Sequence, residues 1–470
     1  MLIARNKLTN LLGAALLASF LGQPLTTLGA AADNPADLGK VIAAGKAPEG
    51  DSVAASDATD DTPNWQESTL TGDWGGARKR LYDAGVQADL MYTADYLRNN
   101  AGGLQHGGAY MGHTDLVLQF DGEKLFGWTG GSAFLQLISN TGGRVNLNYV
   151  GSLMGVDNLE APVNRTGVFK AWLQQAFLDD RASLRLGLYP IDSEFYVTDA
   201  SGVFLHPSFG MAAEVANFGS LAGPSIYPTS TYAARLRVDP DPAWYAMLAV
   251  SRGIPSERIA TAGPNVSWPK GTGSMLIGEV GFSPAKAGLL RESTPAEAKD
   301  DFVPISKLAV GMWRFSPRFP QLVAVDAADE PLLATHWGAY FLAEQTVFRV
   351  PESNRDLAAF VRYGFTDGRT NTLDYSLSVG FSFRGPFAGR EKDTFGIAAT
   401  RAHAGPQGRA QLSDELGEPL SSAAETAVEM TYRAQLAPGV VLQPLVQRIL
   451  NPGLYLPNAT VAGVRLQLAL

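Results

Sequence analysis

Charged residues recur at every second position in several segments of the chain, with apolar residues between them. Arg235 and Arg237 alternate with Leu236 and Val238, and Arg185 has a similar setting. Alternate side chains of a β-strand point to the same face, so such a segment would have one charged and one apolar face. Arginine and carboxylate groups form charge-assisted hydrogen bonds to hydroxyl groups. A charged face of this kind is suited to contact with small hydrophilic solutes.

The same alternation predicts a larger set of charged residues on the polar faces of their segments. This set comprises Arg185, Arg235, Arg237, Asp89, Asp115, Glu279, Arg362, Glu429 and Arg433. Arg185 follows the tight turn 179–182. Arg235 and Arg237 precede the tight turn 239–242, so we expect the three arginines at similar depth on neighbouring strands. Because like charges repel, this basic patch requires water or acidic residues opposite it. The alternative is that each charge only keeps a polar surface hydrated.

The connection 190–229 is unusually aromatic for a loop in water. Its candidate residues are Asp192, Glu194, Phe195, Tyr196, Phe204 and Phe209. Aromatic side chains gain free energy when they pack against another surface, so we expect the connection to fold inward against the charged faces. Its acids would then lie opposite the arginines and narrow the enclosed space. This makes the connection the candidate constriction; the alternative is a loop that caps the outer mouth.

The sequence contains no pattern that favours catalysis, metal binding or cofactor binding. It has no cysteine, no G-x-S-x-G motif and no H-E-x-x-H motif among its five histidines. His113 and Asp115 share a strand face and could orient an imidazole, but a structural role is the simpler interpretation. We therefore expect no enzyme activity and no cofactor. The net charge of −9 argues against nucleic-acid binding.

Sixteen segments show this alternation or an apolar run of strand length. They are 86–96, 110–120, 131–139, 170–178, 183–189, 230–238, 243–251, 274–282, 307–315, 335–348, 357–366, 373–383, 394–401, 425–436, 440–449 and 461–470. The final residues, GVRLQLAL, place Val464 and Leu466 on one face and Arg465 and Gln467 on the other. An even number of such strands is typical of single-chain bacterial outer-membrane barrels. We predict an all-β fold, a transmembrane barrel of about 16 antiparallel strands with apolar faces toward lipid and polar faces toward a lumen.

The lengths of the connections favour the same architecture. Long connections follow most odd-numbered strands, as at 140–169, and short turns follow most even-numbered strands, as at 179–182. Long external loops and tight periplasmic turns are the pattern of outer-membrane barrels. Two stretches break the rule, since 283–306 is long where a turn is expected and 367–372 is short where a loop is expected.

The N-terminal region is expected to carry an export signal and a linker. Residues 1–32 combine a basic start, an apolar run too short to span a bilayer and an A-x-A site, as in a cleaved signal peptide. Residues 33–69 are rich in Ala and Asp, and we expect them to be mobile. Residues 70–85 fit a short periplasmic helical segment, and residues 86–470 would form the barrel pore.

Three segments resemble, in order, those of a known family. They are GDWGGARKRL in the helical segment, WLQQAFLDDRASLRLGLYPIDSEF followed by FLHPSFG in the centre, and EMTYRAQLAPGVVLQPLVQRILNPG near the C-terminus. From about Leu70 to Leu470 the chain resembles the carbohydrate-selective porins of the OprB family. The resemblance implies a sixteen-stranded outer-membrane porin that passes monosaccharides and similar solutes. The chain departs from the family pattern in ending in Leu470 rather than an aromatic residue, and in having Leu188 rather than arginine after Gly187.

These observations together predict an outer-membrane porin of a Gram-negative bacterium that lets monosaccharides and similar small solutes diffuse through it. A general non-specific diffusion porin, an outer-membrane barrel enzyme and a soluble secreted β protein are the alternatives. The expected partners are hydrophilic solutes, outer-membrane lipid and the barrel-assembly machinery, which would bind the C-terminal strand. The sequence is compatible with a monomer or a homotrimer.

Overall fold

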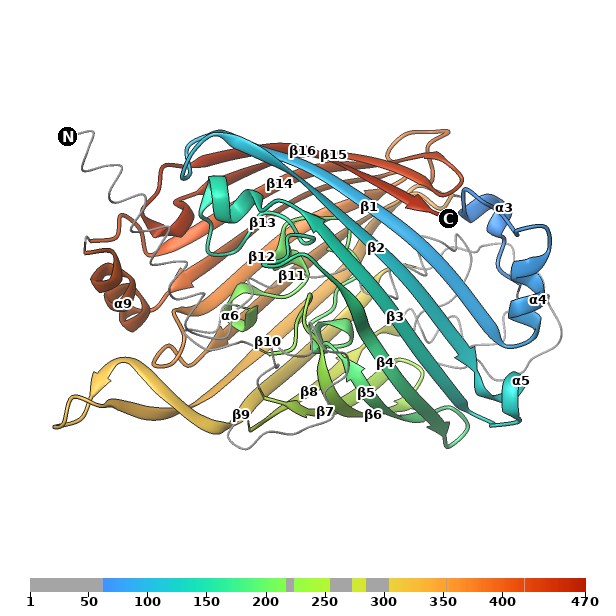
Figure 1. Ribbon diagram of the computed structural model, residues 1–470, viewed down its shortest axis with the longest axis horizontal. Coiled ribbons are helices and arrows are strands. Elements are labelled where there is room, and N and C mark those ends of the chain that lie inside the picture. The colour runs from blue at the N-terminus through green and yellow to red at the C-terminus, as the bar shows by residue number, and fades with distance from the viewer. Residues whose placement is uncertain (1–61, 217–223, 254–272, 285–303, 352, 418) are drawn as a thin grey trace.

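The computed structural model describes residues 62–216, 224–253, 273–284, 304–351, 353–417 and 419–470. Sixteen antiparallel strands form one closed barrel, in which consecutive strands pair and β1 pairs with β16 (Figure 1). The prediction of an all-β barrel of sixteen strands is therefore confirmed. The predicted signal peptide at 1–32 and residues 33–61 of the predicted linker lie outside the described residues.

Each predicted strand has a counterpart in the barrel, and most are longer than predicted because alternation lapses near their ends. The strands are β1 (Val86–Ala101), β2 (Gly107–Asp121), β3 (Gly131–Gly142), β4 (Arg165–Phe177), β5 (Ala182–Tyr189), β6 (Thr231–Asp241), β7 (Trp244–Arg252), β8 (Ser274–Phe282), β9 (Ser306–Val325), β10 (Pro331–Arg349), β11 (Asp356–Thr366), β12 (Leu373–Arg384), β13 (Thr394–Ala404), β14 (Ala424–Ala437), β15 (Val440–Leu450) and β16 (Ala459–Ala469).

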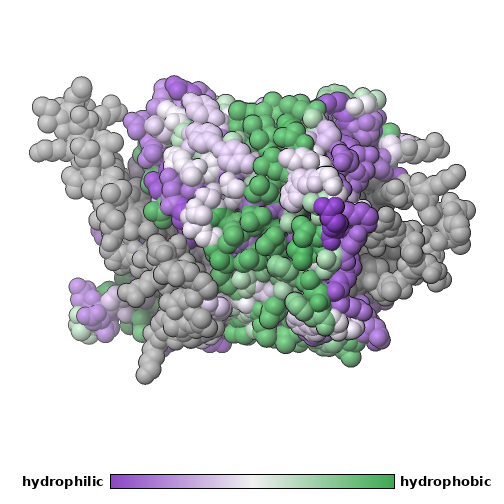
Figure 2. All heavy atoms as spheres, turned by 45° about the vertical axis from the view of Figure 1, so that its right-hand side comes forward, coloured by the Kyte–Doolittle hydropathy of each residue, from purple (hydrophilic) through white to green (hydrophobic). Residues whose placement is uncertain are grey.

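The two faces of each strand differ in burial as the alternation predicts. In β12, Ser376 and Ser378 are buried toward the lumen, whereas Leu377, Val379 and Phe381 are exposed on the outside. The outer surface carries a band of hydrophobic residues with more polar surface on both sides (Figure 2). An apolar band between polar rims is what a barrel spanning a bilayer presents to lipid.

The two ends of the barrel differ in their connections. The short helices α3 (Trp65–Ser68), α4 (Ala77–Asp83) and α5 (Gly122–Phe126) lie at the same end as the C-terminus (Figure 1). The connections at this end are mostly short, with 283–305 the long exception, and those at the opposite end are mostly long. The helices therefore lie at the end with the pattern of a periplasmic side. None of the described helices is both long and apolar enough to cross a membrane.

The strands β9 and β10 extend further than the sequence predicts. They continue pairing beyond the barrel wall as a hairpin that projects at the external end (Figure 1). Pro317 and Pro320 interrupt the alternation in β9, which concealed this extension. Proline is tolerated there because the pairing of β8 with β9 ends at Phe315, so the prolines lie on a free edge.

The outer face of β12 provides a test of this membrane orientation. Val379 lies at the middle of the strand on the outer surface. Val379→Arg should lower the free energy of unfolding by about 2–4 kcal/mol, because a charge at the bilayer midplane is poorly solvated. Denaturant titration in lipid vesicles measures this quantity. Val379→Ile, the matched control, should stay within about 0.5 kcal/mol of the wild type. Equal stability of all three proteins would refute the assignment of this face to lipid.

Candidate functional site

The connection between β5 and β6 folds into the barrel and is called here the inner connection (residues 190–216 and 224–230). It contains η2 (Ile191–Ser193), η3 (Pro207–Phe209) and α6 (Ala213–Ala216). Its four candidate aromatic residues, Phe195, Tyr196, Phe204 and Phe209, are all buried. They pack against lumen-facing side chains of the wall, among them Trp313 and Phe360. Burial of these rings keeps the connection inside the lumen rather than over its mouth.

Carboxylates on the inner wall bind the main chain of the inner connection. Glu429 of β14 accepts hydrogen bonds from the N–H groups of Leu205 and His206, both at 2.8 Å. Glu344 of β10 accepts one from the N–H of Ala200, also at 2.8 Å. A buried carboxylate without partners would cost several kcal/mol. These hydrogen bonds therefore satisfy the acids and fix the path of the connection together.

Glu279 of β8 has a similar role two strands away from Glu344. It accepts hydrogen bonds from the N–H of Tyr196 at 3.1 Å and from the hydroxyls of Tyr245 and Tyr340 at 2.6 and 2.7 Å. The Nζ of Lys307 lies 3.6 Å from the same carboxylate. This predicted lumen residue thus faces inward, but protein groups occupy its hydrogen-bonding capacity.

Arg362 of β11 binds the carbonyl groups of the inner connection. Its guanidinium donates to the carbonyl oxygens of Tyr196 at 3.1 Å and Ser208 at 3.3 Å, and also to those of Phe209 and Gly210. The guanidinium also lies 4.9 Å from the ring centroid of Tyr196. Like Glu279 and Glu429, the predicted lumen residue Arg362 is buried beneath the connection that it holds.

A separate group of charges lies between the start of the inner connection and strands β4 to β6; we call it the arginine–glutamate cluster (Gln174, Arg185, Glu194 and Arg235). The Nε and Nη2 of Arg235 lie 2.8 and 2.7 Å from Oε1 of Glu194. The Nη1 of Arg185 lies 3.4 Å from the same oxygen. Both arginines donate to Oε1 of Gln174 at 3.0 Å. The Arg185 guanidinium stacks on Trp172 at 3.7 Å from the ring centroid.

The three predicted arginines thus have acidic partners, although not the same one. Arg185 and Arg235 share Glu194 and are almost fully buried, whereas the Glu194 side chain keeps 10% exposure. Arg237 is 14% exposed and binds Asp239, with Nη2 and Oδ1 2.8 Å apart. The repulsion expected among three arginines is offset by these two carboxylates.

Burial and neighbouring charges give two acids of the inner connection, Glu194 and Asp192, very different pKa values. Burial raises the pKa of Glu194, but Arg185 and Arg235 outweigh this effect and lower the pKa to about 2. Burial raises the pKa of Asp192 to about 7, because the N–H of Tyr227 and the charge of Lys170 compensate only in part. A permanently ionised acid therefore lies near one that titrates close to neutral pH.

The remaining predicted charges lie on other strands than the cluster. Asp115 forms an ion pair with His113, with Oδ2 and Nε2 2.8 Å apart. Asp89 is buried near the periplasmic end of β1 and accepts a hydrogen bond from Gln87 at 2.8 Å. Arg433 is half-buried in β14. The structure therefore distributes these three residues around the wall and does not join them to the cluster.

A second inward-folded connection was not predicted from the sequence. The connection between β3 and β4, residues 143–164, has Val145, Val150 and Val156 fully buried. Glu425 of β14 accepts hydrogen bonds from two of its main-chain N–H groups, at 2.9 and 3.1 Å. Apolar residues in a long connection were a usable signal, of the same kind as the aromatic residues of the inner connection.

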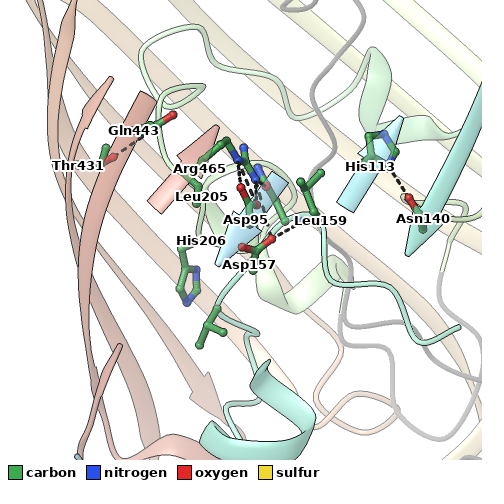
Figure 3. Close-up of polar contacts among 12 residues, drawn as sticks. Asp95, His113, Asn140, Asp157, Leu159, Leu205, His206, Thr431, Gln443 and Arg465 are labelled. Carbon is green, nitrogen blue, oxygen red and sulfur yellow. Dashed lines mark hydrogen bonds and ion pairs between the residues drawn. The ribbon is translucent and has the colours of Figure 1, made fainter. Parts of the chain in front are cut away.

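Arg465 joins this second connection to the seam of the barrel (Figure 3). Its Nη2 lies 2.7 Å from Oδ2 of Asp95 across the β1–β16 seam, 2.5 Å from Oδ1 of Asn158 and 3.9 Å from Oδ1 of Asp157. Burial and the nearby Asp95 raise the pKa of Asp157 well above its ordinary value. The two inward connections meet directly, because the N–H of Asn158 donates to the carbonyl of Leu205 at 2.8 Å.

The chemistry available in this lumen consists of charge and hydrogen bonding. In the part of the chain that the structure describes, no group of three histidine or acidic side chains is arranged to hold a metal ion. Charged and polar groups at a narrowed passage suit a solute that binds weakly enough to leave again.

A closed sixteen-stranded barrel with an apolar outer band and inward-folded connections defines an outer-membrane porin. The family described as "Carbohydrate-selective porin, OprB family" matches residues 105–470, and this chain belongs to that family. It is a channel of the Gram-negative outer membrane and not an enzyme.

Individual relatives match this chain over most of its length. Porin B of Pseudomonas aeruginosa is 23% identical over 454 residues, which span 92% of this chain and 96% of the relative. The putative porin QuiX of Acinetobacter baylyi is 20% identical over 427 residues, which span 85% and 92%. The high-pH structure of Pseudomonas putida OprB has the same fold, with a TM-score of 0.74 at 19% identity over 86% of this chain and 99% of that chain.

Arg362→Ala tests whether the wall charges hold the inner connection. The substitution leaves buried carbonyls without their donor and nearby acids such as Glu214 and Glu344 without this positive charge. The free energy of unfolding should fall by about 3–5 kcal/mol, and the single-channel conductance should rise as the connection loosens. Arg181→Ala in the exposed turn between β4 and β5 is the control and should change neither quantity. Unchanged conductance and stability in Arg362→Ala would contradict the anchoring role.

The pKa of Asp192 predicts that ion selectivity depends on pH. Below about pH 7 this carboxyl is protonated and neutral, so the lumen loses negative charge as the pH falls. The reversal potential in a salt gradient should therefore shift toward anions between about pH 8 and about pH 5.5. Asp192→Asn should show a smaller shift, with wild-type selectivity at the lower pH. A pH profile of Asp192→Asn that matches the wild type would assign the titration to another group.

Proposed function

We propose that this porin carries monosaccharides and similar small solutes by diffusion, and that it holds a sugar briefly at the arginine–glutamate cluster. The supporting observation is the setting of Glu194. Two guanidinium groups lie within 3.4 Å of its Oε1, while its Oε2 is buried and has no hydrogen-bond partner among the described residues. Because a buried ionised oxygen without a donor is costly, a sugar hydroxyl that reaches Oε2 would form a strong, charge-assisted hydrogen bond there.

The residues of the cluster and the neighbouring Arg237 have two roles, to position the Glu194 carboxylate and to contact the solute. Arg185 and Arg235 are buried behind Glu194, so they orient its carboxylate and keep it ionised. Glu194 and Arg237 retain exposed surface and would contact the solute, one as acceptor and the other as donor. Because both side chains are already held by neighbours, little side-chain entropy is lost when a sugar binds.

The other predicted residues support the passage without direct contact in this proposal. Glu279, Arg362 and Glu429 hold the inner connection, and Asp89, Asp115 and Arg433 keep other parts of the wall polar. A monomer or a homotrimer would conduct through the same kind of site, because each barrel has its own inner connection. Insertion would use the barrel-assembly machinery, with the C-terminal strand as its binding segment.

Glu194→Gln tests this assignment in a planar bilayer. Current through single channels is recorded while glucose is added, and the apparent dissociation constant for block is measured. Replacing the carboxylate by a neutral amide should weaken block about tenfold, since a hydrogen bond to a charged group contributes about 1.5–3 kcal/mol and a neutral one less. Glu330→Gln, at the exposed tip of the β9–β10 hairpin, is the control. Its apparent dissociation constant for glucose block should equal that of the wild type.

The same titration separates this function from that of a general diffusion porin. A binding site gives block that saturates with glucose concentration, whereas a non-specific pore shows only a gradual fall in current. Saturable block that is unaffected by Glu194→Gln would leave a sugar porin with a different binding site. Absence of saturation in the wild type would favour the general porin.

A further inference from the structure

Three arginines face outward on alternate strands of one wall of the barrel; we call them the outer arginines (Arg98, Arg401 and Arg448). Arg401 lies in β13, Arg448 in β15 and Arg98 in β1, and the strand order along this wall is β13, β14, β15, β16, β1. Each side chain is exposed and lies between two buried neighbours that face the lumen. Adjacent strands are about 4.8 Å apart, so successive outer arginines are separated by roughly 10 Å across the wall.

The outer arginines lie at a common depth near the external end of the barrel. Each lies two or three residues before the external end of its strand: Arg98 precedes Ala101, Arg401 precedes Ala404 and Arg448 precedes Leu450. Tyr96, the next outward-facing residue of β1 toward the periplasm, is 46% exposed. Exposed tyrosines of this kind mark the boundary between hydrocarbon and headgroups. The outer arginines therefore lie at the level of the headgroups of the external leaflet.

Their immediate surroundings provide hydroxyl groups but no counter-charge. The Nη1 of Arg401 donates to Oγ1 of Thr426 at 3.3 Å, and the Nη1 of Arg448 donates to Oγ1 of Thr460. Both threonines are direct cross-strand partners on the strands between the arginines. Within the described residues, no ion pair joins any of the outer arginines to a carboxylate. The guanidinium groups of Arg401 and Arg448 are thus each held by one threonine, and most of their donors have no hydrogen-bond partner among the described residues.

We propose that the outer arginines bind the phosphate groups of the phosphorylated glycolipid in the external leaflet. A guanidinium beside hydrocarbon is costly unless an anion accompanies it, and its planar donors match the oxygens of a phosphate in two-point hydrogen bonds. A row of three arginines across one wall fits a lipid headgroup with more than one phosphate. The site lies on the outside of the barrel, so it is independent of the sugar pathway.

The test measures binding of purified lipid A to the detergent-solubilised protein by native mass spectrometry. Each arginine beside an anionic lipid surface contributes a factor of roughly five, so the triple variant Arg98→Gln, Arg401→Gln and Arg448→Gln should bind roughly a hundredfold more weakly. Glutamine retains a donor for the threonines. Arg181→Gln, in an exposed periplasmic turn, is the matched control and should bind like the wild type.

Further measurements distinguish the source of the phosphate and check folding. Dephosphorylated lipid A should bind the wild type as weakly as phosphorylated lipid A binds the triple variant. Inorganic phosphate at millimolar concentration should not displace the lipid; complete displacement would show a site for free anions and overturn the lipid assignment. Glucose block should be unchanged in the triple variant, which shows that the barrel is folded. Lipid A binding equal to wild type in a folded triple variant would overturn the proposal.

Discussion

The hydrocarbon of a bilayer offers no partner to a backbone N–H or C=O group, and this constraint governs the whole molecule. Every strand must pair on both edges, so the sheet has to close. The β1–β16 seam achieves this closure between segments at opposite ends of the barrel sequence. The buried ion pair of Arg465 with Asp95 spans the seam on the lumen side, where its charges can be satisfied by protein groups and not by lipid.

Closure of sixteen strands encloses more space than wall side chains can fill, and the two inward connections occupy part of it. Their main chains bring polar groups into a region that water reaches poorly. Carboxylates on the wall accept from the N–H groups, as at Glu429, and Arg362 donates to the carbonyls. Charged wall residues and loop backbone therefore satisfy each other, and the inner connection follows a fixed path inside the barrel.

The charges of arginine side chains are compensated differently on the two sides of the barrel wall. Inside, Arg185 and Arg235 meet the carboxylate of Glu194, so their charges are compensated within the protein. On the outside, Arg98 and Arg448 have no such carboxylate among the described residues, and in our proposal a lipid phosphate supplies the anion. In both settings the rigid, planar guanidinium favours oxygen partners in defined geometry. In the two proposals, the side of the strand that an arginine occupies therefore decides whether it serves the solute site or the lipid site.

Alternation, together with apolar runs of strand length, was enough to predict the sixteen strands. Alternation also predicted the faces of β12, because side-chain direction in a strand depends on whether a position is odd or even. Prolines hid the extension of β9 for the same reason, since they interrupt that local pattern. The sequence also showed that Arg362 and Glu429 face inward, but not what they contact. Glu429 and the N–H of Leu205 are 224 residues apart in the chain, and no local pattern encodes such a meeting. Only the folded barrel decided these partners, because closure and the inward course of the connections determine which distant groups come within hydrogen-bonding distance.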